Sequence, residues 1–228
     1  MTIATNIKER PILFSADMVR AILDGRKTQT RRVIKLPDDA RSVQYWSPPS
    51  GCSEEGYADP GVNYWTDRGN HIDRCPYGQP GDRLWVREAF SPDWCDKTIY
   101  RADDPSGRAA RNAGYNSEPK WKPSIHMPRW ASRITLEVID VRVERLQDIT
   151  EEDARAEGVQ EGCNQCGTDF DMECYSYGGC YQLWCRGDHI PIRINFQHLW
   201  DSISAKSGNG WDENPWVWVV EFNGTDSR

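Results

Sequence analysis

The segment GRKTQTRR, residues 25–32, places four basic residues and two threonines in one short stretch of an acidic chain. Such side chains suit two kinds of chemistry, the binding of phosphates and catalysis by a hydroxyl beside a base. A third interpretation involves no site at all, since cations are favourable near the C-terminal end of a helix. The spacing alone favours this third interpretation.

Strand geometry sets a condition on any site in this segment. If residues 28–32 are extended, Thr28, Thr30 and Arg32 share one face of the strand, and Gln29 and Arg31 share the other. Lys27 and Thr30 therefore converge only if the chain turns between them.

A second cluster consists of five cysteines late in the chain. A CxxC pair followed by further cysteines is typical of structural zinc held by four thiolates. Only one such pair is present and five cysteines exceed the four needed, so free thiols are the alternative. We expect a structural zinc and no organic cofactor, with Cys163, Cys166, Cys174 and Cys180 as ligands and Cys185 as the substitute for Cys180.

Composition limits the partners and the compartment. The net charge of -7 argues against a protein coated with basic residues, although it allows a local basic pocket. Residues 1–10 contain no apolar run of the signal-peptide kind, and no stretch approaches the roughly 20 apolar residues of a membrane span. We therefore expect a cytoplasmic protein without a membrane partner, and Cys52, Cys75 and Cys95 as packing residues.

The elements that must position these residues can be predicted from periodicity. Ser15 is expected to cap a helix that Gly25 ends, and a second short helix has Thr150 three residues before Asp153, as in a capping box, and ends at Gly158. A third helix has apolar residues at helical spacing from Phe196 to Ile203. Strands are expected in ERPILFS, TQTRRVIK, LWVRE, KTIYRAD, SRITLEVIDVRVERL and PWVWVVEF, with a bulge near Ile139 and Asp140 in the longest.

These elements predict an α+β fold with a curved or barrel-like sheet, a few helices and long loop insertions. We expect one domain spanning residues 1–228. The insertions are expected at about residues 36–75, which are rich in Pro, Gly and Asp, and at 161–189, which hold the cysteines.

Four segments carry a resemblance to a known family. ILDGRKTQTRR after a capped helix, GDRLWVRE on a strand, the long strand and ITEEDARAEGV together resemble the ASCH domain, a PUA-like β-barrel family. Longer ASCH proteins of phages and prophages share ERPILFSADMVRAILDGRKTQTRR, CPYGQPGDRLWVRE, KPSIHMPRWASRITLEV and NPWVWVVEF. The resemblance covers most of the chain outside residues 36–70 and 160–190, and it implies a PUA-like barrel in a bacterial host cell.

The resemblance also implies an activity. A small bacterial ASCH member is an amidohydrolase that removes acetyl from N4-acetylcytidine, with its catalytic Lys and Thr in a GRKTxT segment and a Glu near a helix end. The matching positions are Lys27, Thr30 and Glu157. Lys27 would activate the Thr30 hydroxyl, and Glu157 would serve as acid and base. The substrate would then be bound by Arg26, Arg31, Arg32, Trp85, Arg87 and Glu88.

A lysine acts as a base only if its pKa falls below its ordinary value of about 10.4. Burial or the neighbouring Arg26, Arg31 and Arg32 would lower the pKa of Lys27, and carboxylates would raise it. Two other functions stay open: a non-catalytic RNA- or DNA-binding PUA-like module and a ribonuclease. Taken without the resemblance, Glu157 would be a solvated carboxylate at a helix end.

Overall fold

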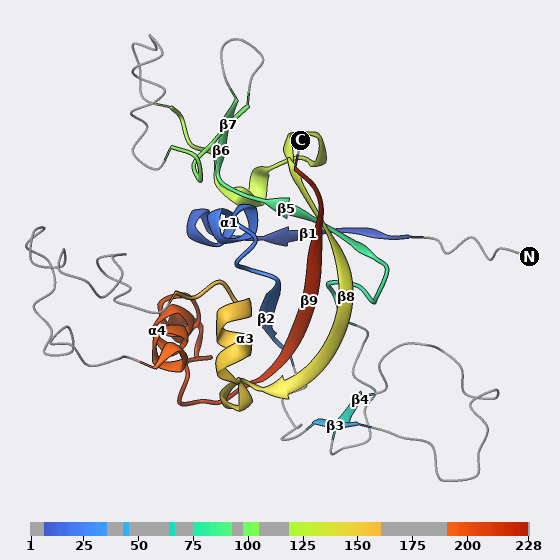
Figure 1. Ribbon diagram of the computed structural model, residues 1–228, viewed down its shortest axis with the longest axis vertical. Helices are drawn as coiled ribbons and strands as arrows, with labels where there is room; N and C mark the ends of the chain where they lie inside the picture. The colour runs from blue at the N-terminus through green and yellow to red at the C-terminus, as the bar shows by residue number, and fades with distance from the viewer. Residues whose placement is uncertain are drawn as a thin grey trace, which may run out of the picture. The chain divides into compact units, whose positions relative to one another are not determined.

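The computed structural model describes residues 7–35, 43–45, 64–66, 75–92, 98–104, 119–160 and 191–227 as a mixed α/β fold with few helices (Figure 1). Its main sheet has five strands in the order β1-β5-β8-β9-β2. These are β1 (Glu9–Leu13), β5 (Arg83–Arg87), β8 (Ile134–Arg145), β9 (Trp216–Ser227) and β2 (Gln29–Val33). Two further antiparallel pairs are β3 (Val43–Tyr45) with β4 (Tyr64–Thr66) and β6 (Phe90–Pro92) with β7 (Thr98–Tyr100).

The sheet is mixed and open. β1 pairs in parallel with β5, and β5 pairs antiparallel with β8. Within the described residues the strand order ends at β1 and at β2, because each of them pairs with a neighbour on one side only. The sheet of the described residues is therefore not a closed barrel, and the predicted barrel is not confirmed. The prediction of strands with few helices is confirmed.

The chain divides into two compact units. The first comprises Met1–Gly25, Leu36–Arg142 and Val220–Arg228, and the second comprises Arg26–Lys35 and Val143–Val219. Both β8 and β9 continue from one unit into the other. The single domain with insertions at 36–75 and 161–189 stays a prediction, since most of those residues lie outside the described ranges.

The first unit is built on alternating strands. On β5, Leu84 and Val86 are fully buried while the alternate residues Arg83, Trp85 and Arg87 are exposed or half-buried, as a strand with one face on the core requires. Helix α1 (Ala16–Leu23) begins as predicted, since the Ser15 side chain accepts a hydrogen bond from Met18 N. It ends at Gly25, whose φ of 72° is a left-handed conformation that glycine adopts without strain.

The predicted irregularity in the long strand is visible in its burial. Along β8, buried and outward residues alternate up to Val138, and then Ile139 and Asp140 are both exposed before Val141 is buried. The inward face therefore shifts by one residue where the sequence predicts a bulge. Before β8, the chain forms two 3-10 turns, η2 (Ser124–His126) and η3 (Arg129–Ala131).

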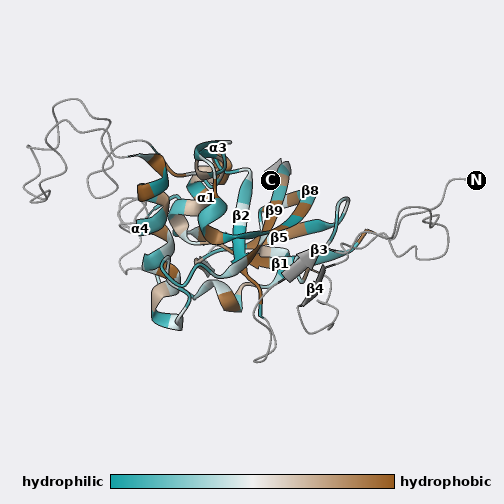
Figure 2. Cartoon of the chain, turned by 90° about the horizontal axis from the view of Figure 1, so that it is seen from below, coloured by the Kyte–Doolittle hydropathy of each residue, from teal (hydrophilic) through white to brown (hydrophobic). Residues whose placement is uncertain are grey.

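The second unit packs two helices around an apolar core. Helix α3 (Glu151–Ala156) and helix α4 (Ile192–Ser204) contribute to it, and α4 buries Phe196 and Trp200. The other buried members are Leu146, Ile149, Ala154, Val159, Ile192, Val217 and Val219. Figure 2 shows β2 as mostly hydrophilic, in contrast to the hydrophobic stretches on β8 and β9. Strand β2 nevertheless begins with three buried residues, so it takes polar groups into the interior.

None of the helices in the described ranges combines the length and the apolar character needed to cross a membrane.

Candidate active site in the second unit

The start of β2 and the end of α3 are joined through their backbones. Thr28 N donates to Ala156 O over 2.8 Å, and Lys27 forms an isolated antiparallel bridge with Glu157. Arg26 Nη1 donates to Gly158 O over 3.1 Å. Two segments 130 residues apart in sequence are thus held in register by main-chain contacts.

Local sequence explains where α3 begins and where it ends. The Thr150 side chain accepts from Asp153 N and the Asp153 side chain accepts from Thr150 N, which is the predicted capping box. Gly158 ends the helix with a φ of 83°. Because Asp153 and Glu157 are four residues apart on this short helix, their carboxylates lie on the same side.

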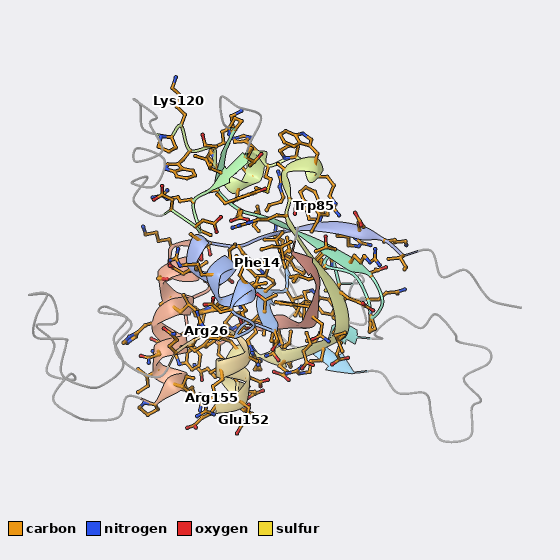
Figure 3. All side chains as sticks on the ribbon, turned by 45° about the horizontal axis from the view of Figure 1, so that its top comes forward. Phe14, Arg26, Trp85, Lys120, Glu152 and Arg155 are labelled. Carbon is orange, nitrogen blue, oxygen red and sulfur yellow. The ribbon has the colours of Figure 1, made fainter. Side chains whose placement is uncertain are left out.

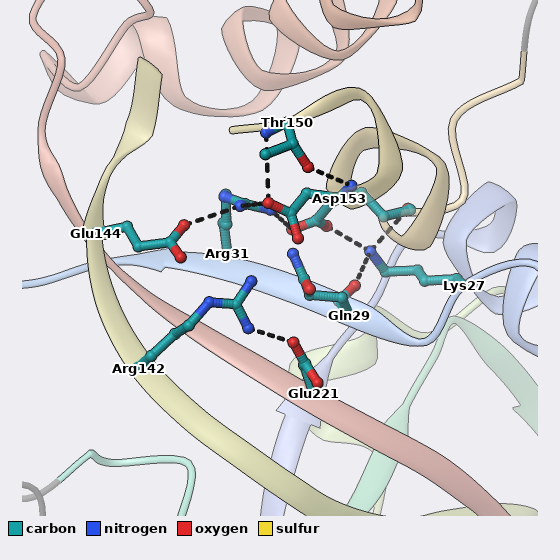
Figure 4. Close-up of polar contacts among 9 residues, drawn as sticks. Lys27, Gln29, Arg31, Arg142, Glu144, Thr150, Asp153 and Glu221 are labelled. Carbon is teal, nitrogen blue, oxygen red and sulfur yellow. Dashed lines mark hydrogen bonds and ion pairs between the residues drawn. The ribbon is translucent and has the colours of Figure 1, made fainter. Parts of the chain in front are cut away.

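The Lys27 ammonium is bonded inside the protein (Figure 4). Its side chain is 0% exposed, and Nζ donates to Gln29 O over 2.8 Å, Glu157 O over 2.9 Å and Glu157 Oε2 over 2.7 Å. An ammonium has three N–H donors, so these three oxygens match its full capacity. The site therefore holds a dry lysine with a carboxylate as its direct neighbour.

Burial lowers the pKa of Lys27 below its ordinary value, because removal from water penalises the charged ammonium. The Glu157 carboxylate raises this pKa in opposition, and Arg32 and Arg31 lower it further. A lysine that acts as a base requires a lowered pKa, so this shift has the required direction. Burial, rather than the neighbouring arginines, is the main cause of the lowered pKa. Arg26 is exposed.

Arg31 holds the other oxygen of Glu157. Its side chain is 0% exposed, and Nη1 contacts Glu157 Oε1 at 3.4 Å while Nη2 contacts Asp153 Oδ2 and Glu144 Oε2, both at 3.1 Å. The guanidinium also lies 5.9 Å from the centre of the Phe196 ring. Glu157 is thus fixed between two buried cations, and the charge of Arg31 is shared among three carboxylates.

Thr30 is buried in β2, 3% exposed. Since neighbouring side chains of a strand point to opposite faces, Thr30 leaves β2 on the face opposite to Arg31. The Lys27 ammonium bonds the carbonyl of the peptide that joins Gln29 to Thr30, so it lies beside the Thr30 backbone. Within the described residues, no hydrogen bond joins the Thr30 hydroxyl to Lys27 or Glu157. The structure thus brings Lys27 and Glu157 together and leaves the hydroxyl outside their contact.

The other predicted substrate-binding residues, Trp85, Arg87 and Glu88, belong to the first unit. Glu88 is 2% exposed, and its two carboxylate oxygens accept from Arg133 at 2.9 Å and 3.1 Å. Arg87 lies over the Trp85 ring, with its guanidinium carbon 5.4 Å from the ring centre. Arg32, in the second unit with Arg26 and Arg31, is half-buried.

Two acidic residues of the network were not expected at the site. Asp153 was predicted only as a capping residue, yet the same carboxylate also binds Arg31. Its helical spacing from Glu157 could have indicated a shared cation. Glu144, at the end of β8, carries no sequence signal that links it to Arg31. Figure 3 shows Glu152 and Arg155, on the same helix as Asp153, extending outward.

The predicted zinc ligands Cys163, Cys166, Cys174 and Cys180, and the substitute Cys185, lie outside the described residues. Among the residues that are described, no group of three or more His, Cys, Asp or Glu side chains is arranged to hold a metal ion. Cys75 lies in the described part and is buried, and burial raises the pKa of its thiol to about 11. A thiol of this kind suits the predicted packing role.

No protein-family model matches this chain, and neither a curated protein nor a solved structure matches it.

Proposed function

We propose that this protein is a PUA-like ASCH amidohydrolase that removes the acyl group from an acylated nucleoside such as N4-acetylcytidine. The observation that carries the proposal is the buried contact between Lys27 Nζ and Glu157 Oε2, at 2.7 Å. These residues were chosen from sequence motifs 130 positions apart, and a chance pair of solvated residues would not converge in the interior. The proposal takes Lys27 as the base, Thr30 as the nucleophile and Glu157 as the acid.

The pair can supply a base and an acid at once. Moving one proton from Lys27 Nζ to Glu157 Oε2 converts an ammonium and a carboxylate into an amine and a carboxylic acid. A dry environment favours this neutral form, because burying separate charges is costly. The lowered pKa of Lys27 supports the amine as the working state.

The reaction then balances in two halves. The Thr30 hydroxyl gives its proton to the Lys27 amine and its oxygen attacks the amide carbonyl carbon, while Glu157 protonates the departing amine as the C–N bond breaks. Water gives a proton to the Glu157 carboxylate and attacks the resulting ester, while the Lys27 ammonium returns its proton to the departing Thr30 oxygen. The carboxylic acid is released, and Lys27, Thr30 and Glu157 are restored to their starting states. The step requires Thr30 Oγ1 to reach Lys27 Nζ when substrate is bound, and such contacts often tighten only in the complex.

The burial of two cations bears on the alternative of a non-catalytic nucleic-acid module. Lys27 and Arg31 are inaccessible and bonded to carboxylates or carbonyls, which leaves Arg26 and Arg32 to meet a phosphate in this segment. A phosphate site normally offers several solvent-facing cations. The same burial suits a site that moves protons.

The test is incubation of the purified protein with N4-acetylcytidine, with cytidine and acetate quantified by chromatography. We expect release by the wild-type protein, and losses of at least about 10²-fold in kcat for Lys27→Met, Thr30→Val and Glu157→Gln. An acetyl group on Thr30, detected by mass spectrometry after rapid acid quenching, would identify the ester intermediate.

Matched controls come from the same elements. Lys35→Met, Thr28→Val and Glu152→Gln make the same chemical changes at exposed positions, and we expect them to leave turnover unchanged. If pure wild-type protein releases no acyl group from N4-acetylcytidine or related N-acylated nucleosides, the proposal is wrong. Equal losses in the controls and in the site variants would also contradict it.

The cysteine cluster adds a structural zinc to the proposal, held by Cys163, Cys166, Cys174 and Cys180. Its support is the donor set, since four thiolates with one CxxC pair suit tetrahedral zinc. Bound zinc would stabilise the fold and take no part in the reaction. Metal analysis of protein purified without added metal should give about one zinc per chain, and only traces would contradict the assignment.

A further inference from the structure

Arg31 lies beside the pair that the proposed reaction uses, although the reaction itself gives it no role. Its side chain is 0% exposed, so it is closed to the substrate that the family resemblance implies it binds. Figure 4 shows its guanidinium between Glu144 and Asp153. A buried guanidinium can act on the reaction only through the groups that it holds.

The three carboxylates around Arg31 are not held equally. Nη2 contacts Asp153 Oδ2 and Glu144 Oε2 at 3.1 Å each, whereas Nη1 contacts Glu157 Oε1 at 3.4 Å. Glu157 in turn lies closer to Lys27, whose Nζ is 2.7 Å from Oε2. Arg31 therefore depends less on Glu157 than on the other two carboxylates.

Burial indicates which of the three carboxylates can take a proton. The Glu157 side chain is 5% exposed, while those of Asp153 and Glu144 are 17% and 25% exposed. Burial penalises the charged form of a carboxyl, and water favours it. Asp153 also accepts a hydrogen bond from Thr150 N, which favours its charged form further. Glu157 is thus the member that becomes neutral most easily, and the other two stay charged.

The proposed reaction neutralises Glu157 whenever this residue holds a proton. If Arg31 were paired with Glu157 alone, that step would leave a dry guanidinium without an anion, which is strongly unfavourable. Asp153 and Glu144 remove this obstacle, because they keep Arg31 paired when Glu157 is a carboxylic acid. When Glu157 is a carboxylate, the same Arg31 fixes one of its oxygens.

We propose that Arg31 is a positioning residue of the amidohydrolase reaction, which orients Glu157 while Asp153 and Glu144 hold Arg31 in both protonation states of Glu157. This role rests on the proposed function and deepens it, because it explains how a carboxylate next to a buried arginine can still exchange a proton. It also moves Arg31 from binding substrate to supporting the acid.

The charge balance around the site agrees with this role. Two cations and three carboxylates in the described residues sum to -1, and Arg32 on β2, which lowers the pKa of Lys27, brings the sum to 0. Helix α4 presents the Phe196 ring to Arg31. A proton that moves from Lys27 to Glu157 leaves this sum unchanged, so the transfer creates no net charge in the interior.

Two variants of Arg31 separate its geometry from its charge. Arg31→Met removes both and should lower kcat for N4-acetylcytidine about 10²-fold, the scale of a misplaced catalytic group. It should also move the rising limb of kcat/KM to higher pH, because Arg31 lowers the pKa of Lys27. Arg31→Lys keeps a charge without the planar fork, so it should recover kcat in part and leave the limb in place.

The two supporting acids are tested together. Asp153→Asn and Glu144→Gln each keep the shape and an acceptor oxygen, and each leaves Arg31 one carboxylate besides Glu157. The double variant leaves Glu157 as the charged partner of Arg31, so its loss in kcat should exceed the product of the single losses by about tenfold. This deficit should shrink as pH is lowered, since the removal of two negative charges lets the site lose its extra proton at lower pH.

Glu152→Gln is the matched control, because it makes the same chemical change at an exposed position of α3. We expect it to change neither kcat nor the pH profile. Circular dichroism verifies folding of every variant, and kcat is expressed per folded protein. If Arg31→Met does not fold, Arg31→Lys and the double variant still decide the question. A merely structural role would lower the free energy of unfolding without moving the pH profile.

A measurement without substrate completes the experiment. Carbon-13 NMR of protein labelled at lysine Cε follows the titration of Lys27, and Lys27→Met identifies its signal. We expect this titration to move to higher pH in Arg31→Met and to lower pH in the double variant.

Three results would overturn the role of Arg31: wild-type kcat in both Arg31 variants, a double variant whose loss equals the product of the single losses, or a Lys27 titration that stays the same in all variants. Failure of the proposed function looks different. The wild-type protein would then release no acyl group, while the Lys27 titration would still respond to Arg31→Met and to the double variant.

Discussion

Among the described residues, each unit buries a glutamate that accepts from a cation at short distance, and the two pairs differ in the cation. In the second unit, Glu157 meets Lys27 at 2.7 Å, and in the first unit Glu88 meets Arg133 at 2.9 Å and 3.1 Å. Burial lowers the pKa of Lys27 overall, whereas the hydrogen bonds that Arg133 donates to Glu88 and Asp103 outweigh burial and raise the pKa of Arg133. A buried lysine can lose its proton, whereas an arginine keeps its proton in proteins.

The difference shows how similar burial serves two purposes. A guanidinium does not lose its proton in proteins, so the Arg133 pair can only orient and hold the chain. A lysine shifts its pKa readily when buried and can become a neutral base. The identity of the cation therefore distinguishes the candidate site from a structural contact better than the presence of a buried carboxylate does.

The largest effect on kcat is expected when lysine and arginine are exchanged at these two positions. Lys27→Arg keeps a positive charge beside Glu157 but removes the proton acceptor, so we expect kcat for N4-acetylcytidine to fall by about 10²- to 10⁴-fold. Arg133→Lys should retain turnover in the protein that folds. Steady-state kinetics on both variants, with circular dichroism to verify folding, measures the effect. A Lys27→Arg protein with wild-type kcat would refute Lys27 as the base.

Removing the structural cation should cost stability instead of rate. Arg133→Met leaves the Glu88 carboxylate buried without its main partner, which typically costs about 3–5 kcal/mol at neutral pH. Burial already raises the pKa of Glu88, and Arg133 counteracts this rise. The free energy of unfolding from urea titrations, compared with wild type, gives the cost.

The pH dependence of this cost has a definite sign. A carboxyl whose folded pKa is raised contributes stability that is full below its unfolded pKa and is lost as pH rises through the folded value. The deficit of Arg133→Met should therefore shrink as the pH is lowered toward 4.5 and grow toward neutrality. A deficit independent of pH would mean that Glu88 is not the cause.

The activity should depend on pH through Lys27. Only the amine form accepts the Thr30 proton, so kcat/KM should rise with pH through the lowered pKa of Lys27 and level off below 10.5. In the same range the folded state binds fewer protons than the unfolded one, so stability should rise with pH and be lost as pH falls. A pH profile of kcat/KM whose rising limb lies at or above 10.5 would contradict the assignment.

The smallest effects should come from the two helix caps. Thr150→Ala and Ser15→Ala each remove a capping side chain, and each should cost about 1 kcal/mol in the free energy of unfolding. Thr150→Ala also frees Asp153, which binds Arg31, so it should lower kcat as well, whereas Ser15→Ala should not. Paired unfolding and kinetic measurements test this, and equal kcat values for the two variants would disconnect the capping box from the site.

Much of the local structure follows from sequence, because short-range chemistry determines it. The caps at Ser15 and Thr150, the glycine ends at Gly25 and Gly158, and the shift at Ile139 all depend on neighbours in the chain. The sheet of the described residues is not the closed barrel that was expected, and closure could not be predicted because it depends on which distant strands pair. Ile203 fits the helical pattern of α4 yet is 53% exposed, since periodicity does not reveal how far a core extends.

The site was predictable in part. The pairing of Lys27 with Glu157 was expected only through family resemblance, because spacing alone made each an exposed charge. The contact of Arg31 with three carboxylates could not be foreseen, since Glu144 and Asp153 come from different elements. Composition also gave no sign that two cationic side chains would be completely buried in an acidic chain.

The edge position of β2 has a consequence for how the protein is made. A ribosome releases Lys27 long before it adds Glu157, and later still the strand against which β2 pairs, β9. Until then Arg31 on β2 and Lys27 just before it lack the acids that neutralise them, and burying such charges is costly. We therefore expect β2 to dock among the last elements of the second unit, so an unfinished chain lacks the contact between Lys27 and Glu157.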